Sequence, residues 1–204
     1  MVSSLPTGSS DRSGRAPGTD VTLPEWARRA RGGWTWTGER RPPWADTPGS
    51  DQESVWDYPR PPSLDFVDRH VVVQLGQTII AETRKPARVL ETSHPPTYYI
   101  PRADVRDEYL SPASGSSGCE WKGVASYWTI RTEDGLVDER GAWSYEEPFP
   151  EFASIRGHLS FYPSRFACFV DGERVQPQAG GFYGGWVTSD LAGPFKGEAG
   201  SAGW

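Results

Sequence analysis

The residues best suited to chemistry stand close together in segment 119–123, which reads Cys-Glu-Trp-Lys-Gly. Cys119 is a candidate catalytic nucleophile, because a thiol reacts as the thiolate and a nearby cation favours that form. Lys122 is a candidate base, Schiff-base nucleophile or anion anchor, because a lysine between Trp121 and Gly123 can be partly desolvated. The alternatives are a small buried hydrophobic cysteine and an exposed lysine whose stem covers the tryptophans.

A single long strand is predicted across 119–131, and it would keep these two groups apart. Residues three positions apart on a strand point to opposite faces, so Lys122 would reach Cys119 only through a bulge. Residues 111–118 are predicted to form a flexible loop, because they are almost entirely Ser, Gly, Ala and Pro. Such a loop would give a ligand access to Cys119.

Charged residues farther upstream form a second candidate group. Glu91 ends an apolar strand and is a candidate catalytic carboxylate, while Arg102 follows a short aromatic strand and is a candidate ligand anchor. A buried carboxylate needs a partner, so a Glu91–Arg102 pair is plausible. Asp104 is expected to cap a short helix over 102–110. A structural salt bridge and a helix cap would explain the same residues without any function.

Aromatic residues on neighbouring predicted strands could wall a pocket for a planar or cyclic ligand. In the strand, Trp128 is expected to share a face with Ile130, while Tyr127 points the other way. Core packing is the competing explanation, since the chain is poor in Leu and Ile. The candidate ligand-binding aromatics are Tyr98, Tyr99, Trp121, Trp128, Trp143 and Tyr145.

The elements that would position these residues are short strands separated by Gly- and Pro-rich turns, which predict a mostly β fold. Two hairpins stand out: 70–75 with 78–83 around Gly76-Gln77, and 166–170 with 173–175 around Asp171-Gly172. The other predicted strands are 88–92, 97–100, 136–139, 142–145 and 157–162. Together these elements predict a core domain over 53–176.

The two ends of the chain differ from this core. Residues 1–52 are rich in Ser, Gly, Pro and Arg and are predicted to form a partly disordered tail. Its arginines alternate with tryptophans, which suits single-stranded nucleic acid or anionic lipid, or docking onto the domain itself or onto a second subunit in a homodimer. Residues 177–204 are rich in Gly and aromatics and are predicted to form an extended strap over the core.

Composition argues against several classes of partner. The net charge of −6 and the pI of about 5.1 disfavour nucleic acid. No apolar run could span a membrane or direct secretion, so a cytoplasmic location without a membrane partner is expected. Two cysteines and three histidines, none at ligand spacing, predict no metal site, and no cofactor is predicted.

Four separate motifs resemble domain-of-unknown-function family 427, in its longer actinobacterial-type form. They are residues 90–105, 119–128, 142–145 with Pro148, and 157–162, so that the resemblance spans about 69–170. It implies a β-tent-like arrangement of two small antiparallel sheets with one short helix, as in methionine sulfoxide reductase B and the ligand-binding domain of cereblon. The zinc-binding Cys-x-x-Cys pairs of many such proteins are missing from this sequence.

The leading hypothesis is a small-molecule-binding β domain with an aromatic-walled pocket near Lys122, whether or not it catalyses a reaction. A non-catalytic recognition module for a ligand or protein is the first alternative, by analogy of fold. Nucleotidyl transfer is the second, because the family also carries a nucleotidyltransferase-like label. Against it, Gly115-Ser116 is not followed by the acidic pair that such enzymes use to hold two metal ions.

Overall fold

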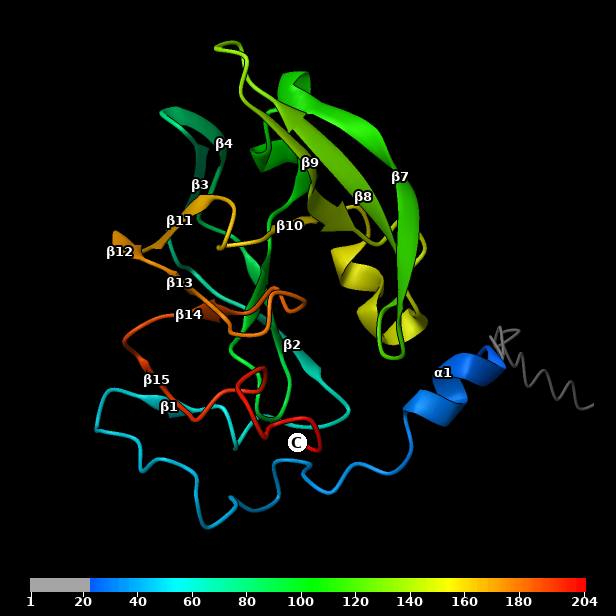
Figure 1. The fold of residues 1–204 in the computed structure, drawn as a ribbon, viewed down its shortest axis with the longest axis vertical. Helices are drawn as coiled ribbons and strands as arrows, with labels where there is room; N and C mark the ends of the chain where they lie inside the picture. Colours follow the sequence, from blue (N-terminus) through cyan, green and yellow to red (C-terminus); the bar gives the residue numbers. More distant parts are fainter. Residues whose placement is uncertain (1–22) are drawn as a thin grey trace, which may run out of the picture.

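Two tight hairpins build the first four-stranded sheet, as the turn residues predict. The computed structural model describes residues 23–204, and in it β3 (Val71–Leu75) pairs with β4 (Thr78–Thr83) across Gly76. β11 (Ala167–Val170) pairs with β12 (Glu173–Arg174) across a turn in which Asp171 and Gly172 both have positive φ. The strand order is β12-β11-β3-β4, and Figure 1 shows these four strands side by side.

A second four-stranded sheet corrects two predictions. Its strands are β7 (Leu110–Cys119), β8 (Gly123–Arg131), β9 (Val137–Ser144) and β10 (Leu159–Phe161), in the order β10-β9-β8-β7. The predicted loop over 111–118 is therefore an edge strand, whose polar residues suit an exposed edge. The predicted strand over 119–131 is interrupted, because the chain reverses at 120–122 between β7 and β8. The strands predicted at 136–139 and 142–145 form most of one strand, β9.

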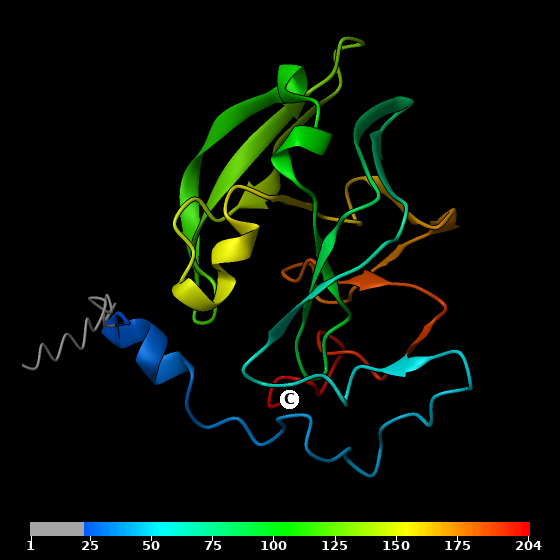
Figure 2. The ribbon, with the colours of Figure 1, turned by 180° about the vertical axis from the view of Figure 1, so that it is seen from behind.

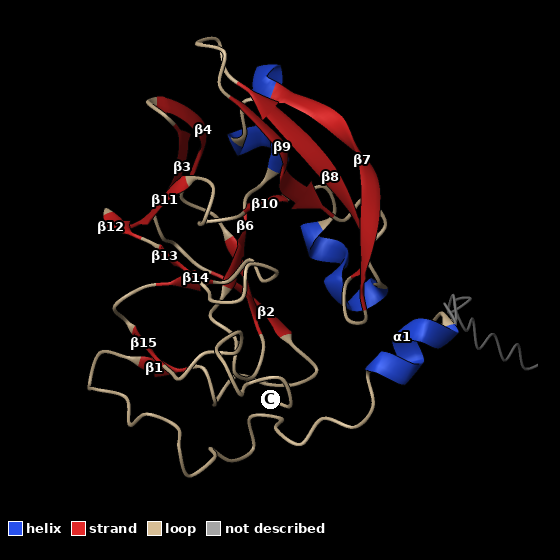
Figure 3. Cartoon of the chain, in the orientation of Figure 1, coloured by secondary structure: helices blue, strands red, loops and turns tan. Residues whose placement is uncertain are grey.

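Smaller sheets complete the fold. β2 (Ser63–Phe66), β5 (Ala87–Leu90) and β6 (Thr97–Tyr99) form a three-stranded antiparallel sheet. Two-stranded sheets join β1 (Glu53–Ser54) in parallel to β15 (Leu191–Ala192), and β13 (Gln176–Pro177) to β14 (Trp186–Val187). The mostly β prediction is confirmed (Figure 3), with five small sheets in residues 23–204 where two were expected.

The helical segments are short, and the range in which the sequence predicted one continuous helix holds two 3-10 turns instead of an α-helix. The predicted helix over 102–110 is instead two 3-10 turns, η1 (Arg102–Asp104) and η2 (Asp107–Tyr109). Val105 between them is extended and bridges Ala81, so pairing with β4 outcompetes helix formation. Asp104 caps no helix and accepts a hydrogen bond from Thr83 Oγ1 at 2.5 Å. The other helical segments are α1 (Glu25–Ala30) and η3 (Pro150–Ile155).

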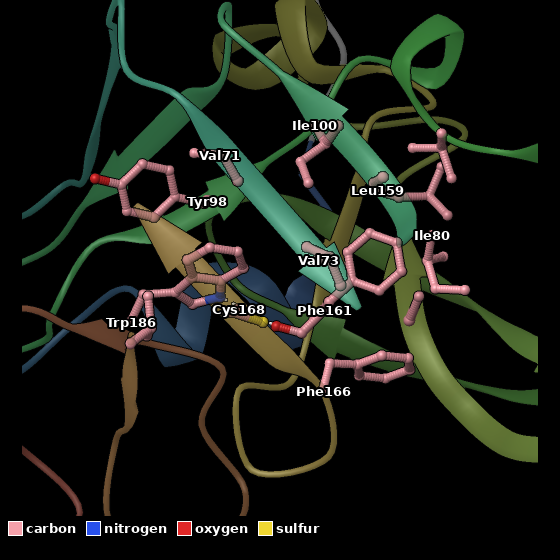
Figure 4. Close-up of a cluster of buried hydrophobic side chains, with 14 of the residues drawn as sticks. Val71, Val73, Ile80, Tyr98, Ile100, Leu159, Phe161, Phe166, Cys168 and Trp186 are labelled. Carbon is pink, nitrogen blue, oxygen red and sulfur yellow. Dashed lines mark hydrogen bonds between the residues drawn. The ribbon is translucent and has the colours of Figure 1, made fainter. Parts of the chain in front are cut away.

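One hydrophobic cluster, here called the aliphatic core, fills the space between the two four-stranded sheets. Val73 of β3, Ile80 of β4, Leu159 of β10 and Cys168 of β11 are all fully buried in it. Figure 4 shows these side chains packed around the ring of Phe161. The core holds the two sheets together.

A second hydrophobic cluster, here called the aromatic cluster, packs β5 and β6 against the other face of β8 and β9. Alternation along the strands assigns residues to one cluster or the other. On β6, Tyr98 enters the aliphatic core whereas Tyr99 enters the aromatic cluster. On β9, Ala142 and Trp143 divide in the same way.

The segment that follows α1 and the C-terminus meet at one pole of the molecule. Segment 31–52 runs beneath the smaller sheets and past the C-terminus, as Figure 2 shows from behind. There Trp36, Trp44, Trp56 and Trp204 pack ring against ring, with centroids 5.2–6.5 Å apart. Among residues 23–204, no helix is long and apolar enough to cross a membrane.

Candidate functional site

A cavity of about 310 Å³ lies beside the aromatic cluster. Its wall comes from segments far apart in the sequence: the N-terminal segment, β5, β6, the β7–β8 hairpin, β9 and the C-terminal strap. This volume lies at the lower end of the range for small-molecule sites. The aromatic side chains of the wall are Trp34, Tyr99, Tyr127, Trp143, Tyr145, Tyr162, Phe182 and Tyr183.

The β7–β8 hairpin brings Cys119 and Lys122 to the same cavity, although a continuous strand would have separated them. Cys119 ends β7, and the chain reverses before Gly123 begins β8. Gly123 has φ of 106°, a conformation that residues with a side chain rarely adopt. The backbone N–H of Phe149 donates to Lys122 O at 3.1 Å and fixes the turn.

Lys122 is a buried cation. It is 9% exposed, and its Nζ lies 5.9 Å from the ring centroids of both Tyr145 and Phe152. Burial acts to lower the pKa of Lys122, but Cys119, Tyr99 and Glu91 outweigh it and raise the pKa above its ordinary value. Within residues 23–204 no carboxylate lies within salt-bridge distance of this ammonium.

Polar aromatic side chains surround the Cys119 sulfur. Trp143 Nε1 donates to Tyr99 OH at 3.3 Å, and the Tyr99 and Tyr145 rings lie 6.3 Å apart. Burial raises the pKa of both tyrosines, so they remain phenols that can donate hydrogen bonds. Cys119 itself is half-buried, which leaves its thiol open to the cavity.

Glu91 also lines the cavity, but its partner differs from the predicted one. Arg60 Nε donates to Glu91 Oε1 at 3.1 Å, and its other nitrogens donate to the carbonyls of Trp36 and Thr92. The Arg60 guanidinium lies 4.2 Å from the Trp34 ring centroid. Burial lowers the pKa of Arg60, with Glu91 opposing the shift. The predicted Glu91–Arg102 pair is therefore wrong, because Arg60 from the N-terminal side occupies that place.

The remaining predicted ligand-binding residues lie away from the cavity. Arg102 pairs with Asp107 at 2.6 Å and lies 4.4 Å from the Trp128 ring centroid. Trp128 points with Ile130 toward the aliphatic core, and Tyr127 points toward the cavity, as strand alternation predicted. The structure places the other two elsewhere: Tyr98 packs against Trp186 in the aliphatic core, and Trp121 packs beneath Arg31.

His94 belongs to the cavity wall, but the sequence did not identify it as a candidate site residue, although it lies in the first family-like motif. Gln178 Nε2 donates to His94 Nδ1 at 3.1 Å and to Lys196 O at 2.7 Å, while its Oε1 accepts from the backbone N–H of Gly185. Burial and the charges of Arg60, Lys196 and Lys122 lower the pKa of His94 to about 3. His94 is therefore a neutral imidazole whose free N–H is on Nε2.

The C-terminal strap supplies a second buried cation, Lys196. This residue is 6% exposed, and its Nζ donates to Trp204 O at 2.5 Å. The strap fits here because of its glycines: a Cβ on Gly184 would stand 2.2 Å from the Trp143 ring. Its high Gly and aromatic content was visible in the sequence, but its contact partners were not.

Within the described chain, no three His, Cys, Asp or Glu side chains are grouped so that they could hold a metal ion. The polar groups of the cavity wall include two ammonium groups, two carboxylates (one of them paired with Arg60), one thiol, one neutral imidazole and several phenols. Such a set can bind an organic ligand by charge, hydrogen bonding and ring stacking.

Comparison with known proteins gives a family but no established activity. No curated protein shows significant similarity to the chain. Residues 63–176 match the family model described as a domain of unknown function (DUF427). This match covers more than half of the sequence and all strands from β2 to β12. The chain therefore belongs to the DUF427 family.

Proposed function

We propose that this domain binds a small planar molecule in the cavity beside the aromatic cluster. The observation that carries the proposal is the composition of the wall, in which aromatic rings from six separate segments line the same cavity as the buried Lys122 ammonium. A pocket with apolar walls and a few convergent polar groups is the usual form of a small-molecule site. The rings would stack on the ligand, and Lys122, His94 and the phenols would orient it.

The groups that could act on such a ligand are Cys119 and Lys122. A thiol that faces a cavity can serve as a nucleophile, and a neighbouring ammonium can bind an anionic group of the ligand. Glu91 is not assigned a catalytic role in this proposal, because its carboxylate is already bound by Arg60. Catalysis would therefore depend on the hairpin that carries Cys119 and Lys122.

A recognition module is the second candidate function, and Phe182 favours it. This side chain lies at the cavity and is 75% exposed, the highest value among the large hydrophobic residues described. An exposed ring beside a pocket suits a ligand that is attached to a larger partner, such as the side chain of a protein. A search for bound ligands by native mass spectrometry separates the two candidate functions. A recognition module would retain a macromolecule and leave it chemically unchanged.

The test is native mass spectrometry of the purified protein after incubation with a metabolite extract. We expect a bound small molecule on the wild type and none on Thr97→Phe, whose new ring would fill the cavity from β6. Val124→Phe is the matched control, because Val124 lies on the outer surface of β8 and is 53% exposed. Equal retention by both variants, or no adduct on the wild type, would contradict the proposal.

Nucleotidyl transfer stays a separate prediction with its own test. Thermal stabilisation of the wild type that requires both a nucleoside triphosphate and Mg²⁺ would support it. The planar-ligand proposal expects no such joint requirement.

A further inference from the structure

One buried charge at the cavity, the Lys122 ammonium, is not bound by a carboxylate of the described residues. Arg60 and Glu91 form an ion pair at 3.1 Å and account for each other. The remaining charged side chains of the wall are Lys122, Lys196 and the half-exposed Glu120. Lys196 Nζ donates to the main-chain oxygens of Ala202 and Trp204, which leaves Lys122 as the ammonium of the wall without an oxygen partner among the described residues.

Both lysines of the wall are buried, and burial makes the missing partner of Lys122 significant. The sequence contains three lysines, and the two at the cavity are 9% and 6% exposed, whereas Lys85 is exposed on the surface. Within residues 23–204 Lys122 forms no salt bridge, whereas the Lys196 ammonium already donates to the main-chain oxygens of Ala202 and Trp204. An ammonium that is removed from water without a counter-charge is strongly destabilised. The fold therefore keeps positive charge where a ligand could neutralise it.

Neutral donors reinforce this preference for an acceptor. Because His94 Nδ1 accepts from Gln178, its proton is on Nε2, which is the nitrogen left for a ligand. Trp34 lines the same cavity, and its buried Nε1 has no acceptor among the described residues. The N–H groups of His94 and Trp34 are thus available as hydrogen-bond donors at a cavity whose apolar surfaces are aromatic rings.

We propose that the ligand is a small aromatic monoanion, with an aromatic carboxylic acid as the simplest case. The inference rests on the proposed function and adds the chemical class of the ligand. The carboxylate binds to Lys122, with Lys196 contributing further positive charge. The ring packs among Tyr99, Trp143 and Tyr145, which form the apolar wall next to Lys122.

The test compares each acid with its own primary amide, which has the same shape without the charge. Binding of indole-3-carboxylate and indole-3-carboxamide, and of benzoate and benzamide, is measured by calorimetry at low ionic strength. The acids are expected to bind at least about tenfold more tightly than the amides, because a buried ammonium discriminates by charge. Added salt should weaken the acids more than the amides.

Lys122→Met removes the charge and keeps the length of the side chain. This variant is expected to lose the preference for acids while it still binds the amides, and Lys196→Met is expected to reduce the preference in part. Lys85→Met is the matched control and should behave as the wild type. A preference for acids that persists in Lys122→Met would overturn the assignment of the carboxylate to this residue.

Failure of this inference can be distinguished from failure of the proposed function. If acids and amides bind equally well, the pocket stands and the anionic class is wrong. If the wild type shows no preference but Cys119→Ser acquires one, the Cys119 thiolate is the counter-ion of Lys122 and the inference is again wrong. Absence of binding by all four probes at millimolar concentration would overturn it as well, and the adduct search described above then decides the proposed function.

Discussion

The aliphatic core and the aromatic cluster share strands β6, β8 and β9 but are packed by opposite means. In the aliphatic core, Ile, Val, Leu and Phe side chains leave Cys168 fully buried, and the Trp186 Nε1 donates to Phe161 O at 3.1 Å. Beside the aromatic cluster, rings with polar tips enclose a cavity that keeps Cys119 half-buried and Lys122 charged. One face of the shared strands thus packs into a solid core, and the other borders a cavity.

The largest expected difference between the two regions is in their response to the loss of a ring. Phe161→Ala should lower the free energy of unfolding by about 4 kcal/mol, because Phe161 is fully buried and its removal leaves a void. Trp143→Ala should cost about half as much, because its ring already borders a cavity that water can enter. Urea denaturation measures both values. Equal losses would show that the aromatic cluster is packed as tightly as the core.

The two cysteines provide a smaller and more specific contrast. Cys168→Ser should destabilise the protein by about 2 kcal/mol, because the hydroxyl would be buried among apolar side chains. Burial also raises the pKa of the Cys168 thiol, which should not react with a thiol reagent before unfolding.

For Cys119→Ser we expect a change within about 0.5 kcal/mol, because the side chain is half-buried and faces a polar cavity. In the folded protein, a thiol reagent should label Cys119 alone. Peptide mass mapping after a short reaction identifies the labelled residue. Labelling of Cys168 at a similar rate would refute the contrast between the two regions.

The third prediction concerns the pH dependence of the free energy of unfolding, to which His94 in the cavity wall contributes. The pKa of His94 is about 3 in the folded protein and about 6.5 in the unfolded chain. The unfolded chain therefore takes up the proton first as pH falls. The stability that neutral His94 confers is present above pH 6.5 and is lost as the pH approaches 3, by up to about 1.4 kcal/mol per pH unit.

The variant His94→Asn provides the comparison, because its side-chain oxygen can still accept a hydrogen bond from Gln178. Its free energy of unfolding should fall less steeply between pH 6.5 and 4 than that of the wild type. Parallel pH dependences in the two proteins would mean that His94 is protonated in the folded state as easily as in the unfolded chain.

Local sequence signals predicted the parts of the fold that depend on neighbouring residues. Both hairpins follow from Gly76 and from the Asp171-Gly172 pair, because the turn conformation requires particular residues. Alternation along β8 placed Tyr127 and Trp128 on opposite faces correctly. The same alternation separates Tyr98 from Tyr99, but nothing in the sequence showed which of the two faces the cavity.

Contacts between distant segments could not be predicted in this way. Strand β7 lacks the usual β-forming residues, and it is a strand because it pairs with β8 along its length. The partner of Glu91 is Arg60, and the second buried cation is Lys196, which lies near the end of the chain. Cys119 and Lys122 meet because of a chain reversal that periodicity alone did not reveal.

The most direct test of the central claim uses the two indole N–H groups that report on the two regions. Trp143 Nε1 lies at the cavity wall, and Trp186 Nε1 lies in the aliphatic core. An equimolar mixture of indole-3-carboxylate and indole-3-carboxamide is titrated into the ¹⁵N-labelled protein and followed by NMR. The Trp143 indole resonance should shift in a saturable way, while that of Trp186 remains in place. An unchanged Trp143 resonance, or equal shifts at both tryptophans, would contradict the assignment of the binding site to the aromatic side.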